Sequence, residues 1–187
     1  MYPQNILNVC QNCTINEVDT LDHVLGQNEF PEFAVHPNNL FPCCSSCNKK
    51  KSDKFVDENG SQLFLNLFLD DLPCSQYLYV SFGDNWLPNF YLKQPEGVPD
   101  TVFNLIESHY KRLDLLKRFS DGSNTIISSL RSIIRSFAVT DVEVRKGIED
   151  YCREQGPVIG YNHREIVLYR ALSSSEAFID ECIERLR

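Results

Sequence analysis

The sequence predicts an α+β protein: a small metal-stapled unit over residues 1–58, followed by a short hairpin and a mainly helical domain over residues 59–187. Three observations predict this organisation. The first segment holds two Cys-x-x-Cys pairs among Asn- and Pro-containing turns, and it shows little helical periodicity. An aromatic, strand-like stretch comes next. From residue 100 onward, hydrophobic side chains recur at helical spacing.

Paired cysteines dominate the N-terminal unit. Cys10-x-x-Cys13 and Cys44-x-x-Cys47 are separated by 30 residues. Four thiolates in two such pairs close a tetrahedral zinc site without an open position, so this metal is expected to be structural. Cys43 can replace Cys44 as a ligand, although the spacing to Cys47 favours Cys44. A disulfide scaffold is the alternative, but the paired spacing and an N-terminus without a secretory pattern favour zinc.

The middle of the chain predicts a β-hairpin. Residues 76–82 (QYLYVSF) are rich in aromatic and β-branched side chains, which favours a strand. Gly83-Asp84-Asn85 is a turn signal, and residues 89–93 (NFYLK) supply the returning strand. Residues 57–60 (DENG) form the polar turn at which we place the boundary between the two domains.

The remaining residues predict several helices. Asp100 is the expected N-cap of the first helix, and Gly122 lies just past its end. Thr140-x-x-Glu143 and Ser173-x-x-Glu176 have capping-box spacing and predict two more helix starts. A further helical face precedes Thr140, and one follows Ser173. These faces comprise Ile126, Ile127, Leu130, Ile133, Ile134 and Phe137, and then Phe178, Ile179, Cys182 and Leu186.

Composition restricts the class of protein. Hydrophobic residues make up 42% of the chain, which is enough for a real core, and no apolar run reaches the length of a membrane span. We therefore expect a soluble, cytoplasmic protein without membrane contact. The formal net charge is −8, whereas proteins that grip nucleic acid alone usually have a basic surface. The acidic balance suggests that a metal or a protein partner supplies part of any attraction to nucleic acid.

Polar residues between and after the cysteine pairs form a recognisable motif. Leu21-Asp22-His23 ends an apparent strand, Asn39-Leu40-Phe41 leads into the second pair, and Asn48-Lys49-Lys50-Lys51 opens a helix. Over residues 10–54 this order of cysteine pairs, Asp-His, Asn-Leu and C-x-x-C-N-x-x-K resembles the HNH (ββα-metal) endonuclease family. The resemblance implies a β-hairpin and a helix that hold one catalytic divalent ion.

Phosphodiester hydrolysis explains why these residue types are needed. The attacking water must lose a proton, and an imidazole near neutral pH can accept it, a role that falls to His23. A hard cation such as Mg²⁺ or Mn²⁺ prefers oxygen ligands, which Asp22 and the amide of Asn48 can supply. The resemblance implies that Asn39 braces the loop and orients His23, whereas on its own it is an ordinary turn asparagine.

Lysines surround the end of the motif. Lys49, Lys50, Lys51 and Lys54 follow the second cysteine pair and are candidate phosphate contacts. The alternative is a solvated helix face without a ligand. The loop after His23 departs from the family, because it contains Val24-Leu25-Gly26 where many relatives have a proline and a basic residue. This departure puts substrate contacts of that loop in doubt.

The sequence therefore predicts a metal-dependent HNH endonuclease that acts on nucleic acid, DNA rather than RNA. The alternative is a zinc-stabilised nucleic-acid-binding or partner-docking module without catalysis. We also expect a protein partner, such as an ATPase or sensor subunit, on the helical domain. Residues 28–44 and 63–119 are similar to compact bacterial HNH proteins of anti-phage systems such as Septu and its retron-linked relatives, which implies a defence role.

Overall fold

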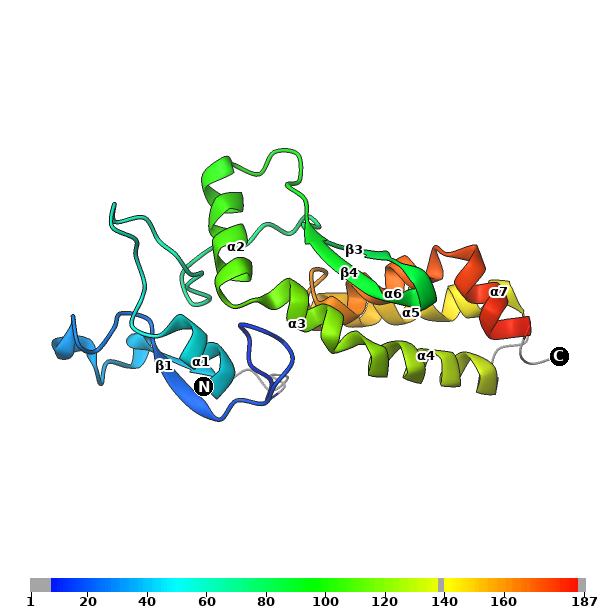
Figure 1. Ribbon diagram of the computed structural model, residues 1–187, viewed down its shortest axis with the longest axis horizontal. Coiled ribbons are helices and arrows are strands. Elements are labelled where there is room, and N and C mark those ends of the chain that lie inside the picture. Colours follow the sequence, from blue (N-terminus) through cyan, green and yellow to red (C-terminus); the bar gives the residue numbers. More distant parts are fainter. Residues whose placement is uncertain (1–7, 138–139, 185–187) are drawn as a thin grey trace. The chain divides into compact units, whose positions relative to one another are not determined.

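The computed structural model describes residues 8–137 and 140–184 and is an α+β structure. Within these residues there are seven α-helices and two separate two-stranded antiparallel sheets. The chain divides into two compact units (Figure 1). Unit 1 comprises Met1–Pro73 and Glu96–Leu115, and unit 2 comprises Cys74–Pro95 and Leu116–Arg187. None of the described helices is long and apolar enough to cross a membrane.

Unit 1 contains the first hairpin and two helices. Strand β1 (Thr20–His23) pairs with β2 (Leu40–Cys43), in a register that sets Asp22 opposite Phe41 and His23 opposite Leu40. The connection holds two short 3₁₀ turns, Pro31–Phe33 and Pro37–Asn39. Helix α1 (Ser45–Lys51) follows β2 directly and contacts β1. The segment over residues 20–51 is thus two strands followed by a helix.

Helix α2 (Asp100–Arg112) belongs to unit 1, although it lies far along the chain. Its buried face, formed by Phe103, Ile106, His109 and Tyr110, joins a core that includes Phe41, Leu63 and Phe64. The predicted domain boundary at residues 58 and 59 therefore does not coincide with the division of contacts. Residues 59–73 and α2 pack with the cysteine-containing segment because their apolar side chains complete its small core.

Unit 2 begins with the predicted hairpin. Strand β3 (Leu78–Phe82) pairs with β4 (Pro88–Leu92) and confirms that prediction. One face of the hairpin buries Leu78 and Phe90, and the ring of Phe90 contacts that of Phe119 edge-on. The other face exposes Ser81, Asn89 and the stacked pair Tyr79–Tyr91.

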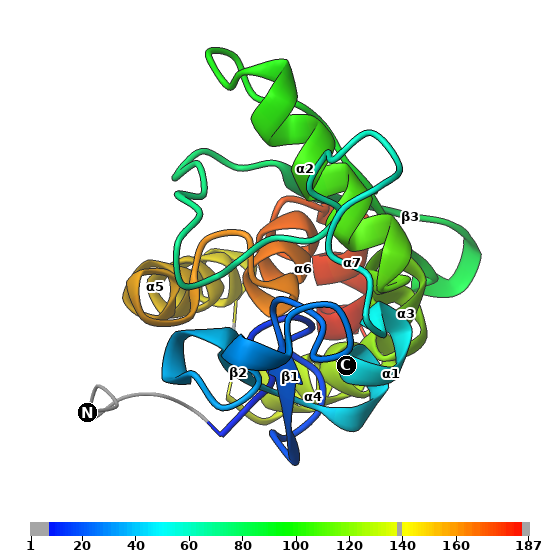
Figure 2. The same ribbon diagram turned by 90° about the vertical axis from the view of Figure 1, so that its left-hand side faces the viewer.

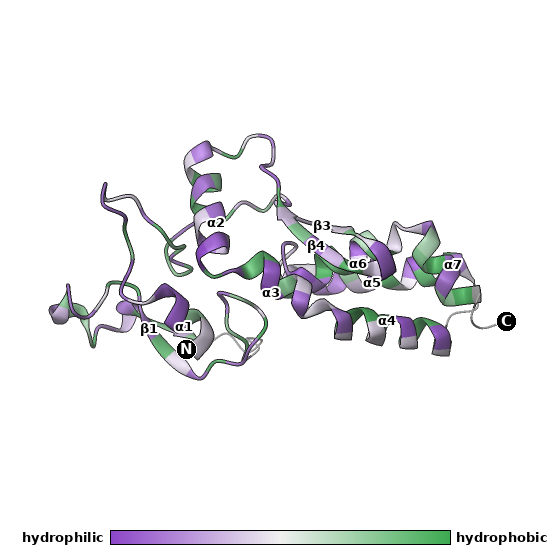
Figure 3. Cartoon of the chain, in the orientation of Figure 1, coloured by the Kyte–Doolittle hydropathy of each residue, from purple (hydrophilic) through white to green (hydrophobic). Residues whose placement is uncertain are grey.

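The helices of unit 2 are α3 (Leu115–Asp121), α4 (Ser123–Phe137), α5 (Asp141–Ile159), α6 (Arg164–Ser173) and α7 (Glu176–Glu184). Helices α5 and α6 lie side by side (Figures 1 and 2). Hydrophobic and hydrophilic positions alternate along α4 (Figure 3). The buried hydrophobic positions of α4 are Ile127, Leu130 and Ile134, which belong to the predicted face, whereas Ile133, also predicted there, is 53% exposed.

The helix ends confirm some predictions and correct others. The Thr140 hydroxyl accepts from the backbone N–H of Glu143, as the capping box predicts. The cap of α2 is Pro99, so Asp100 is instead its first residue. The predicted single helix up to Gly122 breaks at Asp114, whose φ of 55° is left-handed. A short polar side chain tolerates this conformation better than most residues do.

The last helix begins at Glu176, two residues later than a cap at Ser173 predicts. Ser173 ends α6, and its hydroxyl donates to the carbonyl of Arg170 in the same helix. Ser175 instead accepts from the backbone N–H of Phe178. The capping-box spacing misplaces the start because α6 uses Ser173 for its own last turn. Leu186, predicted on the face of this helix, lies outside the described residues.

Candidate functional site

Four buried cysteines gather in unit 1. The sulfur atoms of Cys10, Cys13, Cys44 and Cys47 all lie within 4.8 Å of one another. The Sγ atoms of Cys13 and Cys44 are 3.8 Å apart. A regular tetrahedron with zinc–sulfur bonds of about 2.3 Å has edges of roughly 3.8 Å. The cluster therefore has the dimensions and the donor set to hold a metal such as zinc.

Tight backbone turns present these sulfurs. The N–H groups of Cys13 and Thr14 both donate to the carbonyl of Cys10, at 3.2 and 2.7 Å. At the second pair, the N–H groups of Cys47 and Asn48 donate to the carbonyl of Cys44, each at 3.0 Å. Because Cys44 and Cys47 flank the start of α1, a metal here would tie the helix to the segment before β1.

The cluster also decides between the two adjacent cysteines. Cys44 is a member, whereas Cys43 ends β2 and lies outside the group, although it is fully buried. Burial, helped by the nearby Asp22 carboxylate, raises the pKa of the Cys43 thiol to about 12. Hydrogen bonds from the thiols of Cys10 and Cys47 instead hold the pKa of Cys13 well below its ordinary value. The same hydrogen bond to Cys13 raises the pKa of Cys10 to about 11, so thiolate character within the cluster is centred on Cys13.

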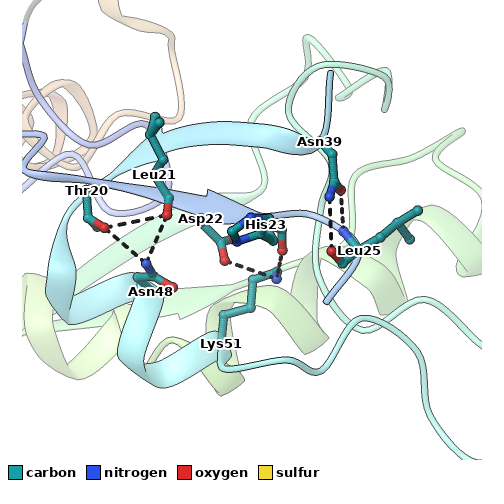
Figure 4. A network of polar contacts seen from close by, with 8 residues as sticks. All are labelled: Thr20, Leu21, Asp22, His23, Leu25, Asn39, Asn48 and Lys51. Atoms are coloured by element: carbon teal, nitrogen blue, oxygen red, sulfur yellow. Dashed lines mark hydrogen bonds and ion pairs between the residues drawn. The ribbon is translucent and has the colours of Figure 1, made fainter. Parts of the chain in front are cut away.

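Helix α1 and strand β1 are joined by a short ladder of polar contacts (Figure 4). The Asn48 amide nitrogen donates to the Thr20 hydroxyl and to the Leu21 carbonyl, both at 3.3 Å. One helical turn later, the Lys51 ammonium donates to Asp22 Oδ1 at 3.2 Å and to the His23 carbonyl at 2.6 Å. These residues of α1 thus face the strand that carries Asp22 and His23.

Asp22 and Lys51 form a buried ion pair. Their side chains are only 6% and 7% exposed, respectively. Burial raises the pKa of the Asp22 carboxyl, and the positive charge of Lys51 opposes that rise. Asp22 and the amide of Asn48 carry oxygen atoms suited to a hard cation, and both side chains lie at the contact between β1 and α1, where Asn48 bonds β1 through its nitrogen. In this arrangement, however, Lys51 occupies one carboxylate oxygen of Asp22.

His23 is half-buried at the end of β1 and has a defined orientation. Its Nε2 lies 2.9 Å from the carbonyl oxygen of Ala34. A carbonyl can only accept, so Nε2 carries a proton and donates it to this bond. In the neutral ring, Nδ1 is then the atom with a free electron pair. The side chain can accordingly accept a proton at Nδ1 while Ala34 holds the ring in place.

Asn39 braces the loop between β1 and β2. Its Oδ1 accepts from the N–H of Leu25 at 2.7 Å, and its Nδ2 donates to the carbonyls of Leu25 and Phe33, both at 3.1 Å. Phe33 precedes the residue that binds the His23 ring. Asn39 is buried and acts on this loop rather than contacting His23 itself. Its position is therefore that of a residue that could orient His23 indirectly.

The four candidate lysines do not behave alike. Lys49, Lys50 and Lys54 are exposed, and Lys50 lies 3.9 Å from Asp114. Lys51 is buried, and its ammonium donates hydrogen bonds to Asp22 and to the His23 carbonyl within unit 1. It therefore does not present its charge to solvent as a phosphate contact would. The N-x-x-K spacing could have indicated that Lys51 differs from the other lysines, because it places Lys51 on the face of α1 that carries Asn48.

His109 supports the cysteine-containing segment from α2. Its Nδ1 accepts from the N–H of Leu65 at 3.2 Å, and its ring also interacts with the backbone of Asn12, between the first two cysteines. Burial lowers the pKa of His109 to about 4. The sequence does not indicate these partners, because Leu65 and Asn12 both lie far from His109 along the chain. The remaining cysteines lie outside the cluster: Cys152 and Cys182 are buried, whereas Cys74 is exposed.

Comparison with known proteins adds one distant relative. The chain is similar to Protein ea31 of Escherichia phage lambda, with 26% identity over 185 residues. The match covers 90% of this chain and 62% of that protein. No protein-family model matches the chain, and no solved structure does. The name of the phage protein states no activity, so function is inferred from the residues of unit 1.

Proposed function

We propose that unit 1 is a metal-dependent endonuclease of the HNH (ββα-metal) type that hydrolyses phosphodiester bonds in nucleic acid. The supporting observation is the grouping of Asp22 and His23 on β1 with Asn48 on α1, beside a four-cysteine cluster. A binding module has no need for an imidazole held in one tautomer by the Ala34 carbonyl, next in sequence to a buried carboxylate. DNA is the substrate we favour over RNA.

His23 is the proposed general base. Its Nε2–H is held by the carbonyl of Ala34, so that Nδ1 can take a proton from a water molecule. The resulting hydroxide attacks phosphorus, and the bond to the leaving oxygen breaks. Asn39 keeps the loop that carries Ala34 in position through its bond to Phe33. Base catalysis of this kind typically contributes about 10²- to 10⁴-fold to the rate.

Asp22 and Asn48 are the proposed ligands of a catalytic divalent ion, Mg²⁺ or Mn²⁺. Such an ion would neutralise charge on the scissile phosphate and on the leaving oxygen. The exposed Lys49, Lys50 and Lys54 are proposed to contact neighbouring phosphates. The cysteine cluster would hold zinc and keep α1 against the hairpin, without a part in the chemistry.

A cleavage assay tests the proposal. Zinc-loaded wild type is incubated with supercoiled plasmid, single-stranded DNA and RNA in Mg²⁺ or Mn²⁺. We expect divalent-dependent cleavage that falls by about 100-fold or more in His23→Ala. His36→Ala is the matched control, because His36 is an exposed histidine in the loop between β1 and β2 whose ring contacts Phe33 and accepts from the N–H of Asn38. Equal cleavage by wild type and His23→Ala would refute the assignment of the base.

The alternative is a zinc-stabilised module that binds nucleic acid or a protein without cutting. The burial of Asp22 against Lys51 is the observation that favours it, because a carboxylate that only pairs with lysine has a structural role. This alternative predicts that wild type binds a nucleic acid or a partner but cleaves no substrate with any divalent ion. Binding that survives in His23→Ala, together with inactive wild type, would decide for it.

We further infer a protein partner for unit 2, such as an ATPase or sensor subunit, in an anti-phage role. The chain as a whole is acidic, and unit 2 carries an apolar groove of about 300 Å³ between α4, α5 and α6. Its lining includes Ile133, Val144, Gly147 and Tyr151. Co-purification from the native host should recover such a partner. Partner control predicts that the isolated chain cleaves plasmid more slowly than the co-purified complex, and equal rates would contradict it.

A further inference from the structure

The ammonium of Lys51 lies in surroundings that suit a cation. It contacts two oxygen atoms of β1, Asp22 Oδ1 at 3.2 Å and the His23 carbonyl at 2.6 Å. The ring of Phe64 adds an aromatic face, with its centroid 6.0 Å from Nζ. Both charged side chains are almost fully buried. A lysine in a short helix normally extends into solvent, so this inward position requires an explanation.

The position of Lys51 bears directly on the proposed metal ligands. Asn48 and Lys51 are three residues apart in α1 and contact consecutive parts of β1. The one carboxylate among the proposed ligands, Asp22, is bonded to the lysine and not to the asparagine. A divalent ion that uses Asp22 must therefore compete with a positive charge already bonded to the same group.

We propose that Lys51 is an internal competitor for the divalent ion: it neutralises Asp22 in the metal-free protein and must be displaced before the site can load. The inference rests on the proposed function, since it concerns the same Asp22 site. In the metal-free state, Lys51 spares the protein an unpaired buried carboxylate, which is strongly destabilising. On loading, the cation takes over that role and the ammonium moves away.

A second carboxylate is available to the displaced ammonium. The charged groups that act on Asp22 are Lys51, His23 and Asp53. Asp53 is exposed, lies two residues beyond Lys51 and accepts a hydrogen bond from the Asn28 amide at 2.6 Å. Because Asp53 acts on the same carboxylate as Lys51, it offers the released ammonium a second acidic group near Asp22.

Manganese binding to the zinc-loaded protein tests this inference without any substrate. Free Mn²⁺ is followed by electron paramagnetic resonance in wild type, Lys51→Met and Asp22→Asn. We expect Lys51→Met to bind Mn²⁺ at least tenfold more tightly than wild type, because removal of a buried competing charge frees the carboxylate. Lys50→Met is the matched control, since it removes the adjacent exposed charge, and we expect it to leave the affinity within twofold. Asp22→Asn should abolish the binding.

Thermal unfolding supplies an independent measurement. Without divalent ions, Lys51→Met should unfold at a lower temperature than wild type, because Asp22 loses its partner. Added Mn²⁺ should raise its unfolding temperature more than that of wild type. If Lys51→Met does not fold, Lys51→Gln replaces it, since an amide can still bond Asp22 and the His23 carbonyl without a charge.

The outcomes separate this inference from the proposed function. Equal or weaker Mn²⁺ binding by both Lys51 variants would overturn the competitor role, even if wild type cleaves DNA. Absence of Mn²⁺ binding in every variant would overturn it as well. Tighter binding by Lys51→Met in a protein that cleaves no substrate would support the competitor role and refute the nuclease.

Discussion

Acidification should weaken unit 1 through His109, and the structure allows the size of the effect to be worked out. The ring is buried and accepts from the N–H of Leu65 at Nδ1, an arrangement that needs the neutral form. Burial lowers its pKa from 6.5 to about 4. In the unfolded chain the ring regains its ordinary pKa, so below neutral pH the unfolded state binds more protons and stability falls.

The two pKa values set the magnitude and the pH window. The stabilisation is complete above pH 6.5 and is lost as the pH falls toward 4. Relative to pH 7.5, about 2 kcal/mol should be lost at pH 5, and the limiting loss is about 3 kcal/mol at about 1.4 kcal/mol per unit of pKa. For a unit of this size, such a loss is a large fraction of the whole free energy of unfolding.

Urea denaturation at pH 7.5 and 5, followed by far-ultraviolet circular dichroism, measures this loss. His109→Gln should be less stable at both pH values but should lose about 2 kcal/mol less than wild type between them. Zinc release on acidification affects both proteins alike and cancels in the comparison. The chain has one tryptophan, Trp86, whose fluorescence reports on unit 2 as an internal control. Equal losses in wild type and His109→Gln would refute the reasoning.

Three further predictions concern the cysteine cluster, the hydrogen bonds of Asn162 and two glycines of α5. Cys44→Ser should abolish zinc binding measured by metal analysis and unfold unit 1, whereas Cys43→Ser should retain the metal, because only the first lies in the cluster. Asn162→Ala should cost unit 2 roughly 2–3 kcal/mol in denaturant titrations, since its amide bonds three backbone groups before and within β3. In α5, Gly147→Ala should increase the free energy of unfolding by up to about 1 kcal/mol and so raise the melting temperature, because the new methyl meets open space. Gly156→Ala should lower it, because its methyl would lie 2.5 Å from a tyrosine ring.

Short-range patterns predicted much of this structure. The hairpin β3–β4 follows from an aromatic stretch, a turn and a returning strand, all within 20 residues. The Cys-x-x-Cys spacing likewise predicted which cysteines meet, and it chose Cys44 over Cys43 correctly. In both cases the decisive interactions are set by local geometry, which sequence spacing encodes directly.

Tertiary packing determines three features that residue-by-residue patterns did not predict: the unit to which α2 belongs, and the buried partners of Lys51 and His109. The membership of α2 in unit 1 depends on which apolar surfaces meet, and helical periodicity states only that a face is buried. Lys51 is the sharper example, because a lysine in a helix ordinarily indicates a solvated face. Its inward position depends on a carboxylate 29 residues away. The same holds for His109, whose partner Leu65 lies 44 residues away.

The cysteine cluster and the Asp22–Lys51 pair can have separate roles because they hold α1 at opposite ends. Cys44 and Cys47 belong to the N-terminal end of α1, whereas Lys51 is its last residue. Asp19 reinforces the first attachment, since its carboxylate accepts from both the N–H and the hydroxyl of Ser45 at 2.6 and 2.7 Å. If the helix depended on Lys51 alone, displacement of that side chain would free α1 from the hairpin. A metal held by the cysteines at its other end would allow α1 to release the lysine and still keep Asn48 against β1.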